Sequence, residues 1–190
     1  MASVTTFMYF AFGSNLLKER LQLRNPSATF QCIGRLKDYH LKFGFHGEQI
    51  TNRWHGGVAT IEESLGKDVW GVIWEMSNDN LDSLDKQEGV GVGIYHPIEV
   101  KVTTEEGEIL CRTYQMNDFK ANIPSPQYMQ VMCLGAKQNG LPLDYLRMLE
   151  TMETNDYSGP SILDDIKEAM ELYQNNQHGH EVAASESEVN

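Results

Sequence analysis

The sequence predicts an α+β fold in which a mixed, barrel-like β-sheet packs against flanking helices. Segments with strand character fill the first two thirds of the 190 residues, and helical segments fill the last third. Strands and helices do not alternate along the chain, which disfavours a parallel, doubly wound sheet. A hydrophobic content of 41% is enough for one domain with a substantial core. We therefore expect a single domain over residues 1–175.

The predicted strands are short runs of alternating or continuous apolar residues. The first is Thr5–Phe12, which stops at Gly13. Further strands are expected within Phe30–Phe43 and over Val58–Ile61, Val69–Met76, Tyr95–Thr103 and Ile109–Met116. A turn is expected at Ser64–Asp68, and the last two strands are expected to pair across a turn at Glu105–Gly107. The polar, glycine-rich segment Gly44–Gly57 is predicted to be an exposed loop.

Capping residues mark the predicted helices. Ser77 is expected to be the N-cap of one helix and Gly89 to close the same helix at its C′ position. Pro126 suits the first position of another helix. The helices are expected over Leu16–Leu23, Asn78–Glu88, Pro126–Gln138, Leu143–Met152 and Ile162–Gln174. Residues 176–190 are polar and acidic and are expected to form a disordered tail.

Composition excludes several classes of function. The formal net charge of −12 argues against nucleic acid or an anionic membrane as a partner, because both require basic patches. The first ten residues lack the features of a signal peptide, and no apolar run approaches the ~20 residues that span a bilayer. Cys32, Cys111 and Cys133 are odd in number and widely spaced, which suggests neither a disulfide framework nor a zinc site. We expect a cytosolic protein without a metal ion.

The junction after the first strand is the first candidate site. A strand that ends at Gly13 and is followed by a helical segment from Ser14-Asn15 leaves unpaired backbone N–H groups in a small space. With the helix dipole, such groups suit a carboxylate, a phosphate or a developing oxyanion. The alternative is an ordinary strand-to-helix turn in which Gly13 supplies only a permissive backbone.

Glu88 is the second candidate. Leu81 and Leu84 define the apolar stripe of the helix Asn78–Glu88, and the i+7 and i+4 positions from them coincide at Glu88. An inward carboxylate at a helix C-terminus has a raised pKa and suits acid–base chemistry near neutral pH. The alternative is that the helix frays and Glu88 turns to water. Three charged residues lie off the stripe and are predicted to be solvated: Asp82, Asp85 and Lys86.

Several longer runs carry a family resemblance. They are YFAFGSNLL, WHGGVATI, VWGVIW, LDSLDKQEGV, PSPQYMQ and CLGAKQNGLPLDY. In order and spacing these runs resemble the γ-glutamylcyclotransferases of vertebrates, over roughly Phe7–Gly159. The resemblance implies a mixed barrel-like fold, a homodimer, and a cofactor-free cleavage of a γ-glutamyl amino acid to 5-oxoproline and the free amino acid. The partner it implies is a small γ-glutamyl dipeptide substrate.

The resemblance also implies roles for residues of this chain. The family's acid–base residue falls on Glu88. The loop that binds the γ-glutamyl group falls on Tyr9, Phe10, Ala11, Phe12, Gly13, Ser14 and Asn15. A tyrosine in contact with substrate falls on Tyr128, and two tyrosines near the pocket fall on Tyr95 and Tyr114. The family usually has tyrosine where this chain has Phe12, and we expect the ring at this position to pack rather than to bind substrate.

Three alternatives stay open on the sequence. A relative of the same superfamily would act on glutathione or on γ-glutamyl-ε-lysine. A non-catalytic regulator would keep the fold and use the acidic tail for interactions. A small carboxylate-binding module would bind its ligand without changing it.

Overall fold

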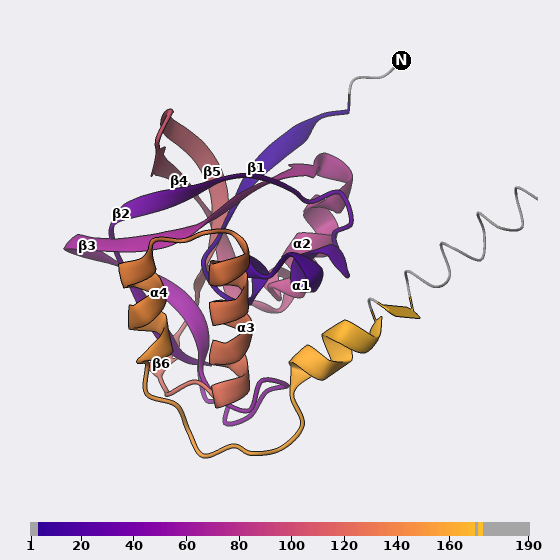
Figure 1. The fold of residues 1–190 in the computed structure, drawn as a ribbon, viewed down its shortest axis with the longest axis vertical. Helices are drawn as coiled ribbons and strands as arrows, with labels where there is room; N and C mark the ends of the chain where they lie inside the picture. Colours follow the sequence, from indigo (N-terminus) through magenta and orange to yellow (C-terminus); the bar gives the residue numbers. More distant parts are fainter. Residues whose placement is uncertain (1–3, 170, 173–190) are drawn as a thin grey trace, which may run out of the picture.

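A closed, mixed β-barrel forms the centre of the computed structural model, which describes residues 4–169 and 171–172 (Figure 1). The strand order is β3-β1-β5-β4-β2-β6, and a further pairing of β3 with β2 closes the barrel. β1 and β5 run parallel, and the other pairs are antiparallel. The strands are β1 Thr6–Ala11, β2 Thr29–His46, β3 Val58–Ser77, β4 Tyr95–Thr104, β5 Gly107–Met116 and β6 Phe119–Ala121. The predicted α+β class and barrel-like sheet are confirmed.

Two strands are longer than predicted. β2 is one strand of 18 residues rather than short runs, and β3 is one strand of 20 residues. The prediction of two strands around a turn at Ser64–Asp68 was therefore wrong. The irregularity there is local: Asp38 of β2 has a φ of 62°, and its carboxylate accepts a hydrogen bond of 2.8 Å from the Gly66 amide. Both halves of β3 keep β2 as their partner, so the strand continues through it.

The helices flank the barrel (Figure 1). They are α1 Lys18–Gln22, α2 Leu81–Gln87, α3 Pro126–Gln138 and α4 Leu143–Glu150, with 3₁₀ turns η1 Ser14–Leu16, η2 Asn78–Asn80 and η3 Val90–Val92. The predicted helix Leu16–Leu23 is replaced by η1 and the five-residue α1. A last helix occupies 162–169. Its predicted end at Gln174 and the predicted tail 176–190 lie outside the described residues.

The predicted caps are confirmed at two helices. The Ser125 hydroxyl accepts a hydrogen bond of 3.1 Å from the Tyr128 amide, and Pro126 occupies the first turn of α3. The Ser77 hydroxyl accepts from the Asp79 amide before η2. Gly89 has a φ of 67°, the left-handed conformation expected of a C′ glycine after α2.

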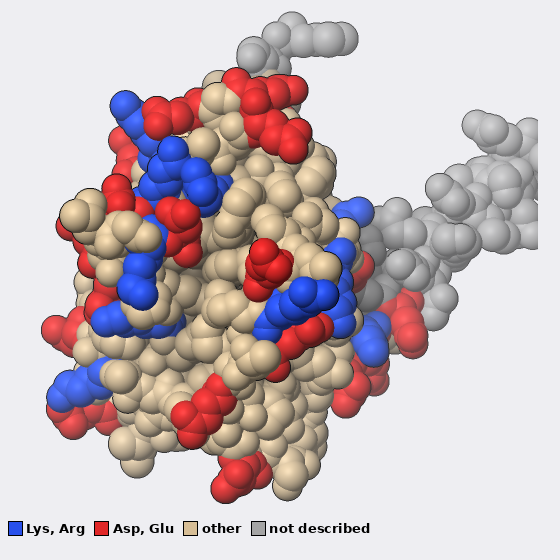
Figure 2. All heavy atoms as spheres, turned by 60° about the vertical axis from the view of Figure 1, so that its left-hand side comes forward, with Lys and Arg blue, Asp and Glu red and all other residues tan. Residues whose placement is uncertain are grey.

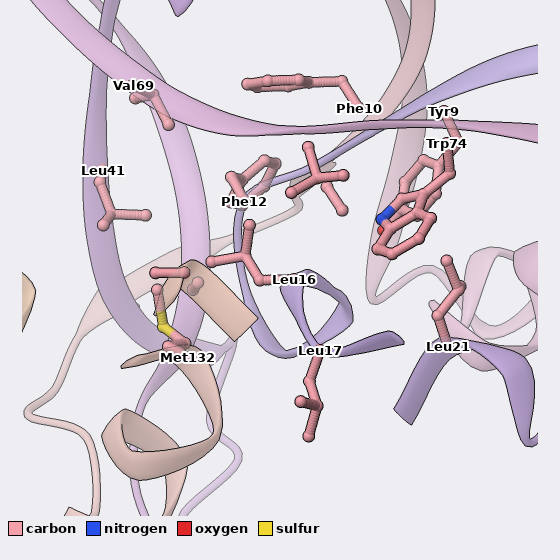
Figure 3. Packing of buried hydrophobic residues seen from close by; sticks show 14 of the residues in the cluster. Tyr9, Phe10, Phe12, Leu16, Leu17, Leu21, Leu41, Val69, Trp74 and Met132 are labelled. Atoms are coloured by element: carbon pink, nitrogen blue, oxygen red, sulfur yellow. The ribbon is translucent and has the colours of Figure 1, made fainter. Parts of the chain in front are cut away.

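Close packing fixes the loop after β1 against α3. A Cβ atom on Gly135 would lie 2.4 Å from the Leu16 carbonyl carbon, so α3 approaches η1 more closely than any other residue would allow. Leu16 is fully buried, and Figure 3 shows it between Phe12 and Met132. The core thus holds the turn that follows the first strand in one position.

Charged side chains of both signs lie beside one another on the face drawn in Figure 2, with uncharged surface between them. All three cysteines are free thiols. Within the described residues, no helix is both long and apolar enough to cross a membrane.

Candidate active site

A cavity of about 840 Å³ opens between the loop after β1 and the end of α2. Most of the residues predicted for the site lie in its wall: Tyr9, Phe12, Gly13, Ser14, Asn15, Glu88, Tyr95, Tyr114 and Tyr128. Phe10 and Ala11 do not, because their side chains lie in the core with 0% and 1% of their surface exposed. The structure therefore brings the two candidate sites of the sequence into one cavity.

Asn15 joins the loop to the acid–base candidate. Its side-chain nitrogen lies 3.1 Å from the Tyr9 hydroxyl and 3.3 Å from Oε1 of Glu88. Its side-chain oxygen accepts a hydrogen bond of 2.7 Å from Gln87. The Trp74 indole donates to its backbone carbonyl at 3.2 Å. These bonds fix Asn15, which is 3% exposed, and through it the position of the Glu88 carboxylate.

Glu88 is the C-cap of α2 and turns inward rather than to water. Burial, the largest cause, raises the pKa of its carboxyl from 4.5 to about 7. Arg20 lowers this pKa, Asp85 raises it, and the Tyr9 hydroxyl lowers it. A carboxyl with a pKa near 7 is present in both protonation states at neutral pH, as proton transfer in two directions requires.

Asp85 was predicted to be solvated, and this prediction was wrong because its carboxylate is bound by two side chains of the protein. The Arg112 guanidinium donates to both of its carboxylate oxygens, at 2.8 and 2.9 Å, and the Tyr114 hydroxyl donates to one of them. Asp85 lies one helical turn before Glu88, and its negative charge raises the pKa of the Glu88 carboxyl. The Tyr114 hydroxyl is used within this network. Asp82 and Lys86 are exposed, as predicted.

The other cavity tyrosines differ in the use of their hydroxyl groups. The Tyr95 hydroxyl donates to the Ala59 carbonyl at 2.7 Å, so its proton is already engaged. The Tyr128 hydroxyl accepts from the Ala59 amide at 2.9 Å. No hydrogen bond among the described residues uses the Tyr128 proton, which leaves this hydroxyl a donor for a ligand.

The loop after β1 is a 3₁₀ turn rather than the start of a helix. The amides of Leu16 and Leu17 bond within it to the carbonyls of Gly13 and Ser14, at 3.1 and 3.2 Å. The Ser14 amide lies close enough to the Tyr128 hydroxyl to lower its pKa, against a larger increase from burial. The predicted anion site thus depends on the few amides from Gly13 to Asn15, with little contribution from a helix dipole.

Sequence reasoning missed Arg20. This residue lines the cavity and is only 9% exposed. A signal for it was available, because Arg20 follows Leu16 by four positions and precedes the buried Leu21. It is a charged residue on the apolar side of a short helix, the same anomaly that identified Glu88. Arg24, Arg53 and Trp54 also line the cavity and were not predicted. In the described part of the chain, no group of three His, Cys, Asp or Glu side chains could hold a metal ion.

The chain is similar to several known proteins. Residues 68–149 match the model of the AIG2-like family. A γ-glutamylcyclotransferase of Bos taurus is 57% identical over 155 residues, which cover 81% of this chain and 82% of that protein. The γ-glutamylcyclotransferase of Homo sapiens is 56% identical with the same coverage. A solved structure of a γ-glutamyl cyclotransferase superposes with a TM-score of 0.82 at 53% identity, covering 86% of this chain and 99% of that one.

The fold and the cavity together define a mixed-barrel domain whose cavity holds an inward-facing carboxyl group with a raised pKa. Sequence identity above 50% over 81% of the chain relates it specifically to the γ-glutamylcyclotransferases. The chain belongs to the γ-glutamylcyclotransferase family.

Proposed function

We propose that this protein is a γ-glutamylcyclotransferase, an enzyme that converts γ-glutamyl amino acids to 5-oxoproline and the free amino acid. The observation that carries the proposal is Glu88, a cavity carboxyl with a pKa of about 7, 3.3 Å from the loop residue Asn15. The names and identities of the relatives support the same reaction.

The chemistry is a ring closure within the substrate. The α-amine attacks the γ-carbonyl carbon, a C–N bond forms, and the amide bond to the departing amino acid breaks, with no water consumed. The nucleophile is tethered to its electrophile, so the enzyme needs to hold the reactive rotamer and move protons. Glu88 accepts a proton from the attacking nitrogen and returns it to the departing nitrogen.

The oxygen of the γ-carbonyl becomes negative in the tetrahedral intermediate and requires hydrogen-bond donors. Two sources are proposed: the Tyr128 hydroxyl, whose proton is unused among the described residues, and the amides from Gly13 to Asn15. Tyr9 and Tyr95 position their neighbours through the bonds to Asn15 and Ala59. Phe12 contributes a packed ring to the cavity wall, where it is 7% exposed.

The proposal is tested by 5-oxoproline release from γ-glutamyl-alanine, glutathione and γ-glutamyl-ε-lysine, assayed side by side with the wild-type protein. We expect γ-glutamyl-alanine to be the best substrate. A preference for either of the other two would assign the protein to a related cyclotransferase activity. Binding of all three without turnover would leave a carboxylate-binding module, and no binding at all would favour a regulator.

Gly13→Val tests the loop. A Cβ atom at Gly13 would lie 3.0 Å from the Tyr128 hydroxyl and 3.2 Å from the Ala59 Cβ, so a larger side chain displaces the proposed donor. We expect KM to rise at least about tenfold while the free energy of unfolding falls by about 1 kcal/mol. Gly91→Val is the matched control, because a Cβ there meets nothing within 4 Å. Equal losses of binding and stability would favour a turn without a binding role.

Three finer properties, which rest on the family resemblance and on the sequence pattern, are proposed with the function. The protein forms a homodimer, it acts in the cytosol in glutathione metabolism, and residues 1–175 fold as one domain without the tail 176–190. Sedimentation equilibrium of the full chain measures the first of these, and urea unfolding of residues 1–175, with a single cooperative transition expected, measures the last. A monomer at micromolar concentration, or loss of folding on removal of the tail, would contradict them.

A further inference from the structure

Arg20 is a buried cation that the described protein leaves without a partner. Only 9% of the residue is exposed, and its Nε is buried without a hydrogen-bond partner. Among the residues that the structure describes, no ion pair or side-chain hydrogen bond reaches its guanidinium. Burying a charge in this way is unfavourable unless an opposite charge compensates for it.

The surroundings of Arg20 hold it at the cavity rather than in the core. Its Cζ lies 5.7 Å from the ring centroid of Trp54, a cation–π distance. Trp54 in turn packs edge-on against Tyr128, with 5.0 Å between the ring centroids. Exposed Arg53 lies 6.0 Å from the same indole and, after burial, is the main cause that lowers the pKa of Arg20. The Arg20 guanidinium therefore contacts Trp54, which in turn contacts the proposed hydrogen-bond donor Tyr128.

The charges of the cavity fit a ligand with an acidic and a basic end. Arg20 and Glu88 both line it and act electrostatically on one another, yet no ion pair joins them. An α-amino acid carries a carboxylate and an amine on one carbon, and Glu88 is the group proposed to exchange protons with the amine. A guanidinium binds a carboxylate through two parallel hydrogen bonds, which Lys cannot do.

We propose that Arg20 is the carboxylate-binding residue of the cavity and completes its ion pair with a carboxylate of the substrate. The inference rests on the proposed function for the identity of the ligand. A γ-glutamyl amino acid offers two such groups, the α-carboxylate of the glutamyl part and the carboxylate of the departing amino acid. Each carboxylate is bonded to a carbon atom that also carries a nitrogen proposed to exchange protons with Glu88. Either carboxylate could therefore pair with Arg20 while its neighbouring nitrogen faces Glu88.

Arg20→Gln tests the proposal. We expect KM for γ-glutamyl-alanine to rise between about 10-fold and 150-fold, the loss of a charge-assisted hydrogen bond, with a smaller change in kcat. Arg20→Lys keeps the charge but not the paired donors and should recover part of the affinity. Lys18→Gln is the matched control, because it removes an exposed cation from the same helix outside the cavity.

A second substrate identifies which carboxylate is bound. γ-Glutamyl-ethylamide has no carboxylate on its departing group. If Arg20→Gln raises KM for this substrate as much as for γ-glutamyl-alanine, Arg20 binds the α-carboxylate. If the effect disappears, Arg20 binds the carboxylate of the departing amino acid. An unchanged KM for γ-glutamyl-alanine in Arg20→Gln would overturn the proposal.

Binding measured without turnover separates this proposal from the proposed function. Calorimetric titration of γ-glutamyl-alanine into Glu88→Gln, with and without Arg20→Gln, should show the same loss of affinity as the kinetics. Wild-type protein that binds the ligand through Arg20 but releases no 5-oxoproline would refute the activity and keep the carboxylate site. If Arg20→Gln does not fold, Arg20→Lys replaces it in the titration. The wild-type protein is then also titrated with γ-glutamyl-alanine in which one carboxylate or the other is amidated. Equal affinity for all these ligands would exclude the site.

Discussion

We expect Glu88→Gln to reduce turnover of γ-glutamyl-alanine by about 10³-fold, in the range of general acid–base catalysis. Glutamine matches glutamate in size and can keep the contact between Asn15 and position 88, so the cavity retains its shape. It cannot exchange a proton with either nitrogen of the substrate. We therefore expect kcat to fall while KM changes little, which is the pattern for a group that acts in the transition state.

Release of 5-oxoproline at saturating substrate measures this effect. Glu99→Gln is the control, because it makes the same chemical change at an exposed position of β4 outside the cavity. The wild-type rate should also rise with pH through about 7 as Glu88 loses its proton and becomes a base. Near-normal turnover by Glu88→Gln would remove this residue from the mechanism.

The position of Glu88 could be predicted from the sequence because it breaks a local rule. Helical spacing from Leu81 and Leu84 needs no tertiary information, and Gly89 marks where the helix ends. The cap at Ser125 and Pro126 is local in the same sense. Features of this kind are encoded within a few residues, and the structure has them where they were expected.

Features that depend on distant partners could not be predicted. Asp85 lies off the apolar stripe of α2, but its partners Arg112 and Tyr114 come from β5, and only the fold brings them together. The continuity of β3 depends on β2, because pairing on both sides of Gly66 overrides a local turn signal. Arg20 is an intermediate case. Its spacing from Leu16 can be seen in the sequence, but the cavity that it lines is formed by segments far apart in the chain.

The burial of Glu88 also makes the free energy of unfolding depend on pH. The pKa of this carboxyl is about 7 in the folded protein against the ordinary value of 4.5 for glutamate, so folding favours its protonated form. The associated stability is fully present below about pH 4.5 and is lost as pH rises through about 7. The total loss corresponds to about 3 kcal/mol. The wild-type protein thus sacrifices stability at neutral and alkaline pH to keep an acid–base group in the cavity.

Glu88→Gln removes this titration, because glutamine is neutral at every pH. The free energy of unfolding of the variant, minus that of the wild type, should therefore increase by up to about 3 kcal/mol between about pH 4.5 and about pH 8.5. Urea unfolding at several pH values measures the difference, in which the titrations of carboxyls that do not interact with Glu88 cancel. Arg20 stays charged throughout, so its changed surroundings shift the offset between the two curves and not their slope. Parallel curves for the two proteins would mean that Glu88 titrates normally, and its role as a base near neutral pH would lose its physical support.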